Sequence, residues 1–483
     1  MIEAAILLAG LFFALVALYR WRTALLLCLP YALMADMGRK AIEGQPVYLS
    51  ALVIVPFAAS MVGAHRAGIP WSLKPLFRHG PALKIPLLLY VILVVLQSLH
   101  AALSTGSAIV AGIGLIAYLA PVLGVLLGYH YARSVPHVRR FLRWYVGFVV
   151  LATLGVYLAR LGVGWEILQP VGPGLVAYSP SGQPLDLETG FFRAAEVAAW
   201  HTAMAICFLF LFVFGRRKVL ASVALVPWLL PLLAGALVLT GRRKGIVEVG
   251  LFLLVYLACL AYFRRGAVKT AVVLALVAVA GLVWFAASSV DQNLAIAPYL
   301  ERGVNIGSED VGRIEDRSLT ALRAVIARNG FFGSGAGTGS QGAQYFGAGA
   351  ELVGKAAEGG MAKILAELGV PGLFLVVWLG IGYMIAFWKV VRASSTGGAV
   401  PAHFAYGFLG FLFANTLTFT IGHQVFGDPL VLMVLGLVAG FLLRMPSLVG
   451  AGPVRRRPRR RRRGLARGRR FPVPLAPHAL TPR

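Results

Sequence analysis

Long apolar runs separated by short polar segments occupy most of the chain between Ala4 and Arg444. Most runs have roughly 16 to 22 residues, the length that an α-helix needs to cross a bilayer. No alternation of apolar and polar residues, as in the strands of a membrane β-barrel, competes with this pattern. The runs predict 13 spans, at 4–19, 23–36, 48–64, 85–103, 108–131, 142–162, 195–214, 219–240, 246–263, 270–287, 359–388, 403–422 and 429–444. The second run is short enough to be re-entrant, so 12 spans also fit the sequence.

The composition agrees with an all-α polytopic membrane protein. Only 13% of the residues are charged, about half of what a soluble domain carries. The first run follows Glu3 and has no basic segment before it, which predicts a retained helix rather than a cleaved signal peptide. We expect one transmembrane domain at 1–450, and a basic, disordered cytoplasmic tail at 451–483.

The positive charge has a clear placement along the chain. Eleven of the 45 basic residues lie between Arg455 and Arg470. Others lie in short segments between runs, among them Arg20, Arg22, Arg66, Lys74, Arg78, Lys84, Arg133, Arg139, Arg140 and Arg143. If the runs cross, these segments share one side with the tail, which is the positive-inside pattern. This predicts a cytoplasmic C-terminus and contact of the tail with anionic lipid, and it disfavours nucleic acid as a partner. The segments 37–47, 163–194, 240–245, 288–358 and 423–428 would then face outward.

The cysteines give no sign of a cofactor. Cys28, Cys207 and Cys259 all lie in apolar runs, without the spacing of metal ligands or of a redox pair. We expect neither a metal nor a redox group.

Two outward segments contain more basic residues than their side predicts. The first contains Arg242, Arg243 and Lys244, at the mouth between two predicted helices. Cations near a bilayer are costly, and the planar fork of arginine suits bidentate contacts with phosphate. An anion site is one interpretation. The other is a turn whose cations reach toward water, with Lys244 paired to Glu248 at i+4.

The second is the large segment 288–358, and structureless loops of that length are usually functional. Leu319, Leu322, Val325 and Ile326 share one face of a short predicted helix at about 315–328. Arg313 and Arg317 stand at the head of this helix. A helix lying on the membrane surface is the alternative interpretation.

A glycine-rich turn and a carboxylate follow this helix. Gly335 and Gly337 would allow a tight turn beside a ligand, while the GxGxxG match that begins at Gly337 lacks the βαβ unit of a dinucleotide site. Glu358 then stands before an apolar helix that contains Glu367-Leu-Gly-Val-Pro-Gly. Nearby arginines could set the pKa of Glu358 for use as a general base. A carboxylate favoured by the helix dipole is the alternative.

This order of parts resembles the catalytic loop of the O-antigen ligase and O-antigen polymerase superfamily. The resemblance covers about 240 to 445, with an arginine at 242 or 243, a second at 313 or 317, the glycine turn and the Glu-Leu-Gly-x-Pro-Gly ending. The ligases have a histidine nine residues before that glutamate, where this chain has Glu358. A carboxylate there resembles the exopolysaccharide polymerase-like members.

The resemblance implies a fold like that of the C-type glycosyltransferases and an active site on the outer face of the bacterial inner membrane. It implies metal-independent transfer of a glycan from undecaprenyl pyrophosphate to a sugar hydroxyl of a glycan or lipid-glycan acceptor. Glu358 would be the base, and Arg313 or Arg317 would act with the 242–244 cations on the pyrophosphate, with Arg193, Gly335 and Gly337 as further contacts. A flippase and a chain-length regulator would be partners.

Two weaker groups of candidates lie elsewhere in the outward segments. Arg193, Glu196 and His201 would line the cleft, or form a local Arg–Glu pair beside a packed histidine. His423 and Asp428 would face the site, or form a polar hairpin.

Two other classes of protein remain open. A flippase or secondary transporter for a glycan or lipid-linked substrate would also have 12 to 14 helices and buried ionisable groups. A non-catalytic scaffold is the third class.

Overall fold

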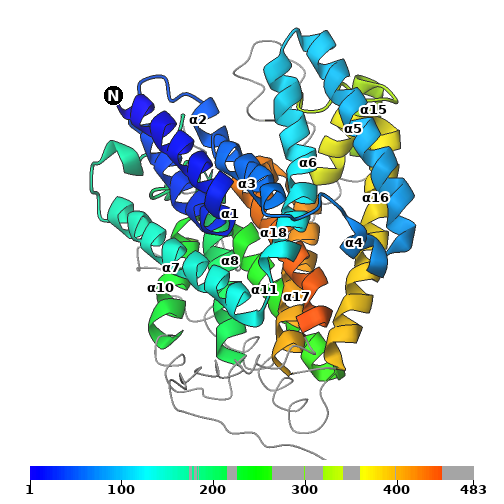
Figure 1. Cartoon of the computed structure of the whole chain (residues 1–483). Coiled ribbons are helices and arrows are strands. Elements are labelled where there is room, and N and C mark those ends of the chain that lie inside the picture. Colours follow the sequence, from blue (N-terminus) through cyan, green and yellow to red (C-terminus); the bar gives the residue numbers. More distant parts are fainter. Residues whose placement is uncertain are drawn as a thin grey trace, which may run out of the picture. The chain divides into compact units, whose positions relative to one another are not determined.

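The computed structural model describes residues 1–172, 177–178, 182, 184–214, 226–263, 298–299, 319–340, 359–396 and 399–448. Its helices are α1 (Ile2–Lys40), α2 (Tyr48–Ala51), α3 (Ile54–Arg66), α4 (Lys74–His79), α5 (Lys84–Thr105), α6 (Ala108–Tyr131), α7 (Val135–Arg160), α8 (Ala195–Phe214), α10 (Val226–Leu239), α11 (Arg243–Phe263), α15 (Leu319–Asn329), α16 (Gly360–Ser395), α17 (Ala399–Ile421) and α18 (Pro429–Leu448) (Figure 1). Short 3₁₀ turns lie at η1 (Pro81–Leu83), η2 (Glu166–Leu168) and η4 (Gln424–Gly427). A two-stranded antiparallel ribbon joins β1 (Ala177–Tyr178) to β2 (Pro184–Leu185), with Ala177 opposite Leu185.

Ten helices of the described chain are long and apolar enough to cross a membrane. They confirm the predicted all-α, multi-pass architecture. Large apolar side chains also cover their outer surfaces, for example Leu88, Leu99, Leu151, Phe374 and Ile381. Soluble monomers rarely expose contiguous apolar patches of more than a few hundred Å², so these faces suit contact with lipid. The predicted span 270–287 and the tail lie outside the described residues.

The first two predicted spans form a helical hairpin within α1. Arg20 has non-helical backbone angles (φ −133°, ψ 53°) and interrupts the helix. The two halves then run side by side. The Tyr31 hydroxyl donates a hydrogen bond of 3.3 Å to the Ile6 carbonyl, and Gly38 faces Ile6. The second half continues to Lys40, which is about 30 Å of helix and enough for a full crossing.

Glycines allow α6 and α18 to approach closely. Gly124 and Gly128 on α6 face Gly436 and Gly440 on α18, and a Cβ atom at any of them would collide with the backbone of the other helix. Such small residues four apart are typical of tightly packed membrane helices. The sequence contains both pairs, but only the structure shows that they face each other.

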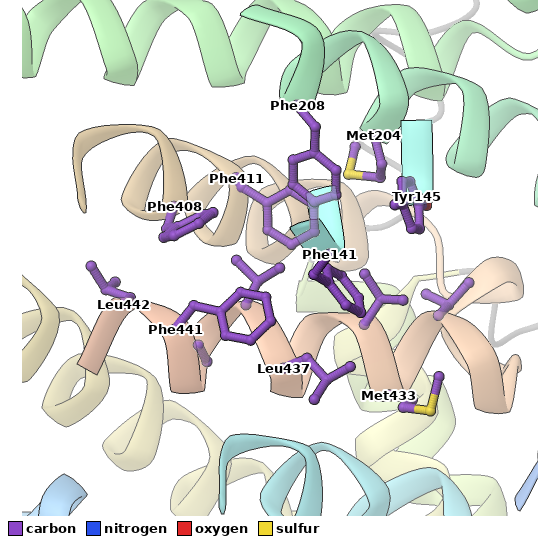
Figure 2. Packing of buried hydrophobic residues seen from close by; sticks show 14 of the residues in the cluster. Phe141, Tyr145, Met204, Phe208, Phe408, Phe411, Met433, Leu437, Phe441 and Leu442 are labelled. Atoms are coloured by element: carbon purple, nitrogen blue, oxygen red, sulfur yellow. The ribbon is translucent and has the colours of Figure 1, made fainter. Parts of the chain in front are cut away.

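An aromatic core joins four helices, as Figure 2 shows. Phe208 of α8 stacks on Phe411 of α17 with ring centroids 5.2 Å apart, and Phe141 of α7 meets Phe441 of α18 edge-on at 5.2 Å. All four rings are fully buried. Offset and edge-to-face pairs of this kind stabilise packing beyond the area they bury. They fix α8, α17 and α18, which lead to the candidate residues at 193–201 and 423–428, against α7.

The predicted span 359–388 is a broken helix. Gly369 of α16 has φ of 69°, which an L side chain rarely adopts, and Pro371 follows. The turn 331–340 docks at this break: the Val370 N–H donates to the Phe331 carbonyl at 2.9 Å, and Ser334 N–H donates to the Ala366 carbonyl at 2.8 Å. Backbone groups freed by the break are therefore bonded within the protein, as an apolar surrounding requires.

The predicted helix at 315–328 is confirmed over its described part as α15, Leu319–Asn329. Val325 is buried against Ala362 and Leu365 of α16, with Leu322 and Ile326 packed around it. The apolar face of α15 thus lies on α16. This packing replaces the alternative of a helix whose apolar face lies in the membrane surface.

Candidate functional site

Four segments predicted to face outward converge in the structure. These are the end of α1, the segment before α8, the turn between α10 and α11, and the turn between α17 and α18. The Lys40 ammonium joins the first two, donating to Thr189 Oγ1 at 3.1 Å and to the Gly190 carbonyl at 2.7 Å. Charged pairs join the others. We call six of the side chains the ionic cluster: Asp36, Arg193, Glu196, Arg242, Lys244 and Asp428.

Arg193 lies between two aspartates from distant parts of the chain. It forms an ion pair with Asp428 and a longer one, 3.7 Å, with Asp36. Ser50 donates to Asp36 at 3.0 Å, and Asp428 accepts the Val431 N–H at 3.0 Å, which caps α18. One cation therefore serves two buried carboxylates.

Electrostatic attraction keeps Arg193 and Asp428 ionised. Burial alone would lower the pKa of Arg193, but Asp428 and Asp36 raise it above its usual value. Burial alone would raise the pKa of Asp428, but the Arg193 charge holds it below its usual value. Because its charge is matched inside the protein, Arg193 has little capacity left for a ligand.

Arg242 and Glu196 form the second pair, with Nη2 and Oε1 2.5 Å apart. Burial lowers the pKa of Arg242, and the Glu196 carboxylate opposes this effect. In place of the predicted local Arg193–Glu196 pair, the structure therefore shows two ion pairs between elements, Arg193–Asp428 and Arg242–Glu196. Among the described residues, Arg242 has one carboxylate partner where Arg193 has two, and the two side chains are similarly exposed, at 21% and 19%.

Lys244 connects the α10–α11 turn with the turn after α17. Its ammonium donates to Gln424 Oε1 at 2.7 Å and lies against Gly422. Glu248, its predicted i+4 partner, is buried and feels the Lys244 charge. Arg243, which lies between Arg242 and Lys244 in the sequence, is partly buried.

His201 is packed rather than open. Its Nδ1 is 2.7 Å from the Tyr145 hydroxyl, its ring stacks on Phe192 at 5.2 Å, and it is 1% exposed. The packed-histidine alternative is the one that the structure shows. His423 is also buried, at the start of the turn that Asp428 ends.

The cavity beside the Arg193 pair is small. Asp36, Ser50, Arg193, His201 and Asp428 line it, together with apolar side chains, and its volume is about 10 Å³. That is roughly the space one water molecule needs. This part of the cluster therefore has no room for a sugar.

The start of α16 meets the same turn as Lys244. Gly360 packs against Phe419, and Gly359 lies beside the Thr420 carbonyl, two residues before the Gly422 that Lys244 contacts. Glu358 precedes Gly359 in the sequence. Glu358, Arg313 and Arg317 themselves lie outside the described residues, so their roles stay predictions.

The glycine turn is held by a carboxylate of the protein. Glu367, fully buried in α16, accepts hydrogen bonds from Gly337 N–H at 3.1 Å, Gly339 N–H at 2.9 Å and the Tyr118 hydroxyl at 2.6 Å. Lys363 lies 4.0 Å away, one turn before it. In the sequence, Glu367 is visible only as part of the Glu-Leu-Gly-x-Pro-Gly ending. Its place inside a predicted span is the signal that a specific partner neutralises it, because ionisable groups in spans are costly.

The turn itself is as tight as predicted. Gly335 and Gly337 have φ of 108° and 95°. A Cβ atom at Gly335 would collide with Ala101 of α5, and one at Gly337 with Val110 and Gly114 of α6. Close packing on α5 and α6 and the bonds to Glu367 thus explain why both positions are glycine. The predicted contact of Gly335 and Gly337 with pyrophosphate stays a prediction.

Comparison with known proteins adds no relative. No protein-family model matches the chain, and no characterised protein matches it either. In the described ranges, no three His, Cys, Asp or Glu side chains are grouped so that they could hold a metal ion. The residues quoted above are therefore the whole basis of the resemblance.

Proposed function

We propose that the protein is a membrane glycosyltransferase that acts on the periplasmic face of the bacterial inner membrane. It would transfer a glycan from undecaprenyl pyrophosphate to a sugar hydroxyl, as a polysaccharide polymerase or an O-antigen-type ligase. One observation carries the proposal: the basic turn at 242–244 and the start of α16 meet at the same turn, through the Lys244–Gly422 and Gly359–Thr420 contacts. Cations for a pyrophosphate and the position after Glu358 thus lie close together.

The reaction needs a base on one side of the anomeric carbon and cations on the other. Glu358 takes the proton of the acceptor hydroxyl as its oxygen bonds to the anomeric carbon. The bond from that carbon to the pyrophosphate oxygen breaks, and the leaving group gains negative charge. Arg242 or Arg243, with Arg313 or Arg317, stabilises this charge, and the course is a single inverting displacement.

The two ion pairs suggest different roles for Arg242 and Arg193. Arg242 has a single carboxylate partner among the described residues, so a phosphate oxygen can share it. Arg193 is matched by two aspartates, so we assign it the positioning of α1, α8 and α18. Lys244 would add charge beside Gln424.

Transfer from a purified lipid-linked glycan tests the proposal. Glu358→Gln should slow transfer by roughly 10²–10⁴-fold, while donor binding survives. Alanine at 242, 243, 313 and 317 should separate each pair into one contacting arginine and one bystander. Lysine should rescue a contacting position only partly, because the bidentate contact is lost.

Arg323→Ala is the matched control, since Arg323 is an exposed arginine on α15. It should transfer at the wild-type rate. If Glu358→Gln and all four alanine variants keep that rate as well, the glycosyltransferase proposal fails.

A second candidate is a flippase or transporter for a lipid-linked glycan. The break of α16 at Gly369, beside buried Glu367 and Lys363, favours it, because transporters use interrupted helices with ionisable groups near their sites. Proteoliposomes separate the two functions. Movement of the lipid-linked glycan across the bilayer without any new glycosidic bond would support the transporter.

A further inference from the structure

Four arginines gather where the α1 hairpin turns, where α6 passes into α7, and where α18 nears its end. We call Arg22, Arg133, Arg140 and Arg444 the basic cluster. Arg22 and Arg133 interact electrostatically, and His130 feels the charges of Arg22, Arg133 and Arg444. His137, in the first turn of α7, feels Arg22, Arg133 and Arg140. Each of the two histidines thus feels the charges of three of the four arginines.

Contacts with aromatic rings hold two of these arginines in place. Arg444 donates to the Tyr129 hydroxyl at 3.0 Å and lies 4.9 Å from the centre of that ring. Arg22 lies 4.2 Å from the centre of the Trp21 ring. Neither of these contacts supplies a negative charge.

The segments predicted to share this side contain no acidic side chain to supply it. None of the 18 acidic residues lies in a segment predicted to share this side, which comprises 20–22, 65–84, 132–141, 215–218, 264–269, 389–402 and 445–483. Within the described chain, Nε and Nη2 of Arg22 and Nε of Arg444 are buried without a hydrogen-bond partner. Buried charge without a partner is costly, so the cluster needs an anion from outside the protein.

We propose that the basic cluster binds the phosphate of an anionic phospholipid. Planar guanidinium groups suit phosphate oxygens, and basic pockets between membrane helices are typical sites for acidic head groups. The surroundings favour lipid over a soluble phosphate. Exposed Tyr19 and Trp144 flank the cluster on α1 and α7, and such aromatic side chains are enriched at membrane interfaces. This inference does not depend on the proposed function.

Lipid retention tests the site with the full-length protein. The protein is placed in nanodiscs of phosphatidylcholine and phosphatidylglycerol, extracted in detergent, washed, and its bound lipid counted by mass spectrometry. The test variant combines Arg22→Gln, Arg133→Gln and Arg444→Gln. The control combines Lys74→Gln, Arg78→Gln and Lys84→Gln, which removes the same charge from exposed positions predicted to share that side.

Wild type and control should retain phosphatidylglycerol in preference to phosphatidylcholine. The test variant should retain on the order of ten-fold less, because each basic residue near the surface contributes several-fold to the attraction of anionic lipid. Equal retention by the test variant, or an equal loss in the control, would overturn the proposal.

A melting measurement keeps folding and binding apart. In lipid-free detergent the test variant should melt close to wild type, because it loses two ring contacts and one hydrogen bond but no ion pair and removes mutual repulsion among the arginines. Added phosphatidylglycerol should raise the melting temperature of wild type and leave that of the test variant unchanged. Stabilisation by inorganic phosphate, with no lipid retained, would instead assign the site to a soluble anion and overturn the lipid assignment.

Discussion

Replacing Glu367 by alanine should destabilise the protein strongly. The substitution leaves three buried donors without their acceptor: the N–H groups of Gly337 and Gly339 and the hydroxyl of Tyr118. Each unsatisfied buried donor costs about 1–3 kcal/mol, and neighbouring losses add incompletely. The free energy of unfolding should therefore fall by about 3–5 kcal/mol. Glu367→Gln should lie between wild type and alanine, because its amide keeps one acceptor but turns an NH₂ group toward the donors.

The protein contains its own reporter for this measurement. Cys28, Cys207 and Cys259 are free and buried, so a thiol-reactive dye labels them only as the fold opens on heating. Glu43→Ala is the matched control, because Glu43 is exposed and surface substitutions usually change stability by less than about 0.5 kcal/mol. If Glu367→Ala and Glu43→Ala melt at the same temperature, the Glu367 carboxylate does not hold the glycine turn at the break of α16.

Three further predictions address topology, charge and packing. A reporter active only in the periplasm should work when inserted near Gly347 and fail after Arg470; the reverse would refute the assigned orientation. Asp428→Asn should cost about 3–5 kcal/mol at neutral pH, since it breaks a buried ion pair. The folded pKa of Asp428 lies below its unfolded value of about 3.9. Wild type should therefore keep the stability of this ion pair above about pH 3.9 and lose it as the pH falls through the folded pKa. The melting temperature of the variant should depend less on acid pH than that of wild type. Gly128→Leu should prevent the close approach of α6 and α18 and lower the melting temperature, while Gly147→Leu, on an open helix face, should not.

Local patterns in the sequence predicted the local structure. Runs of apolar residues located the helices, and the i, i+3, i+4 spacing from Leu322 to Ile326 located α15. The glycine turn was predicted as tight, and both Gly335 and Gly337 have positive φ. These features depend on neighbours within a few turns, so a linear pattern contains them.

Partners distant in sequence were not predictable in the same way. The backbone bond from Arg193 to Asp36 spans 157 positions, and the side-chain bond to Asp428 spans 235. The sequence favoured Glu196, three residues away, because proximity along a helix is all that spacing can show. Likewise, periodicity gives the two small-residue pairs of α6 and α18 but not their contact, since any helix of the bundle could have been the partner.

The ionic cluster and the basic cluster differ in how their positive charge is compensated, and this bears on which arginine of the ionic cluster could bind a phosphate. Arg193 and Arg242 both have carboxylate partners, while the described residues place no Asp or Glu in an ion pair with the basic cluster. On the predicted topology, anionic lipid would supply the counter-charge of the basic cluster, whereas carboxylates of the ionic cluster supply it for Arg193 and Arg242. A pyrophosphate at Arg193 or Arg242 would therefore compete with an internal carboxylate. Among the described residues, two aspartates would oppose binding at Arg193 and Glu196 alone would oppose it at Arg242, so the 242–244 turn is the better candidate for the proposed phosphate contact.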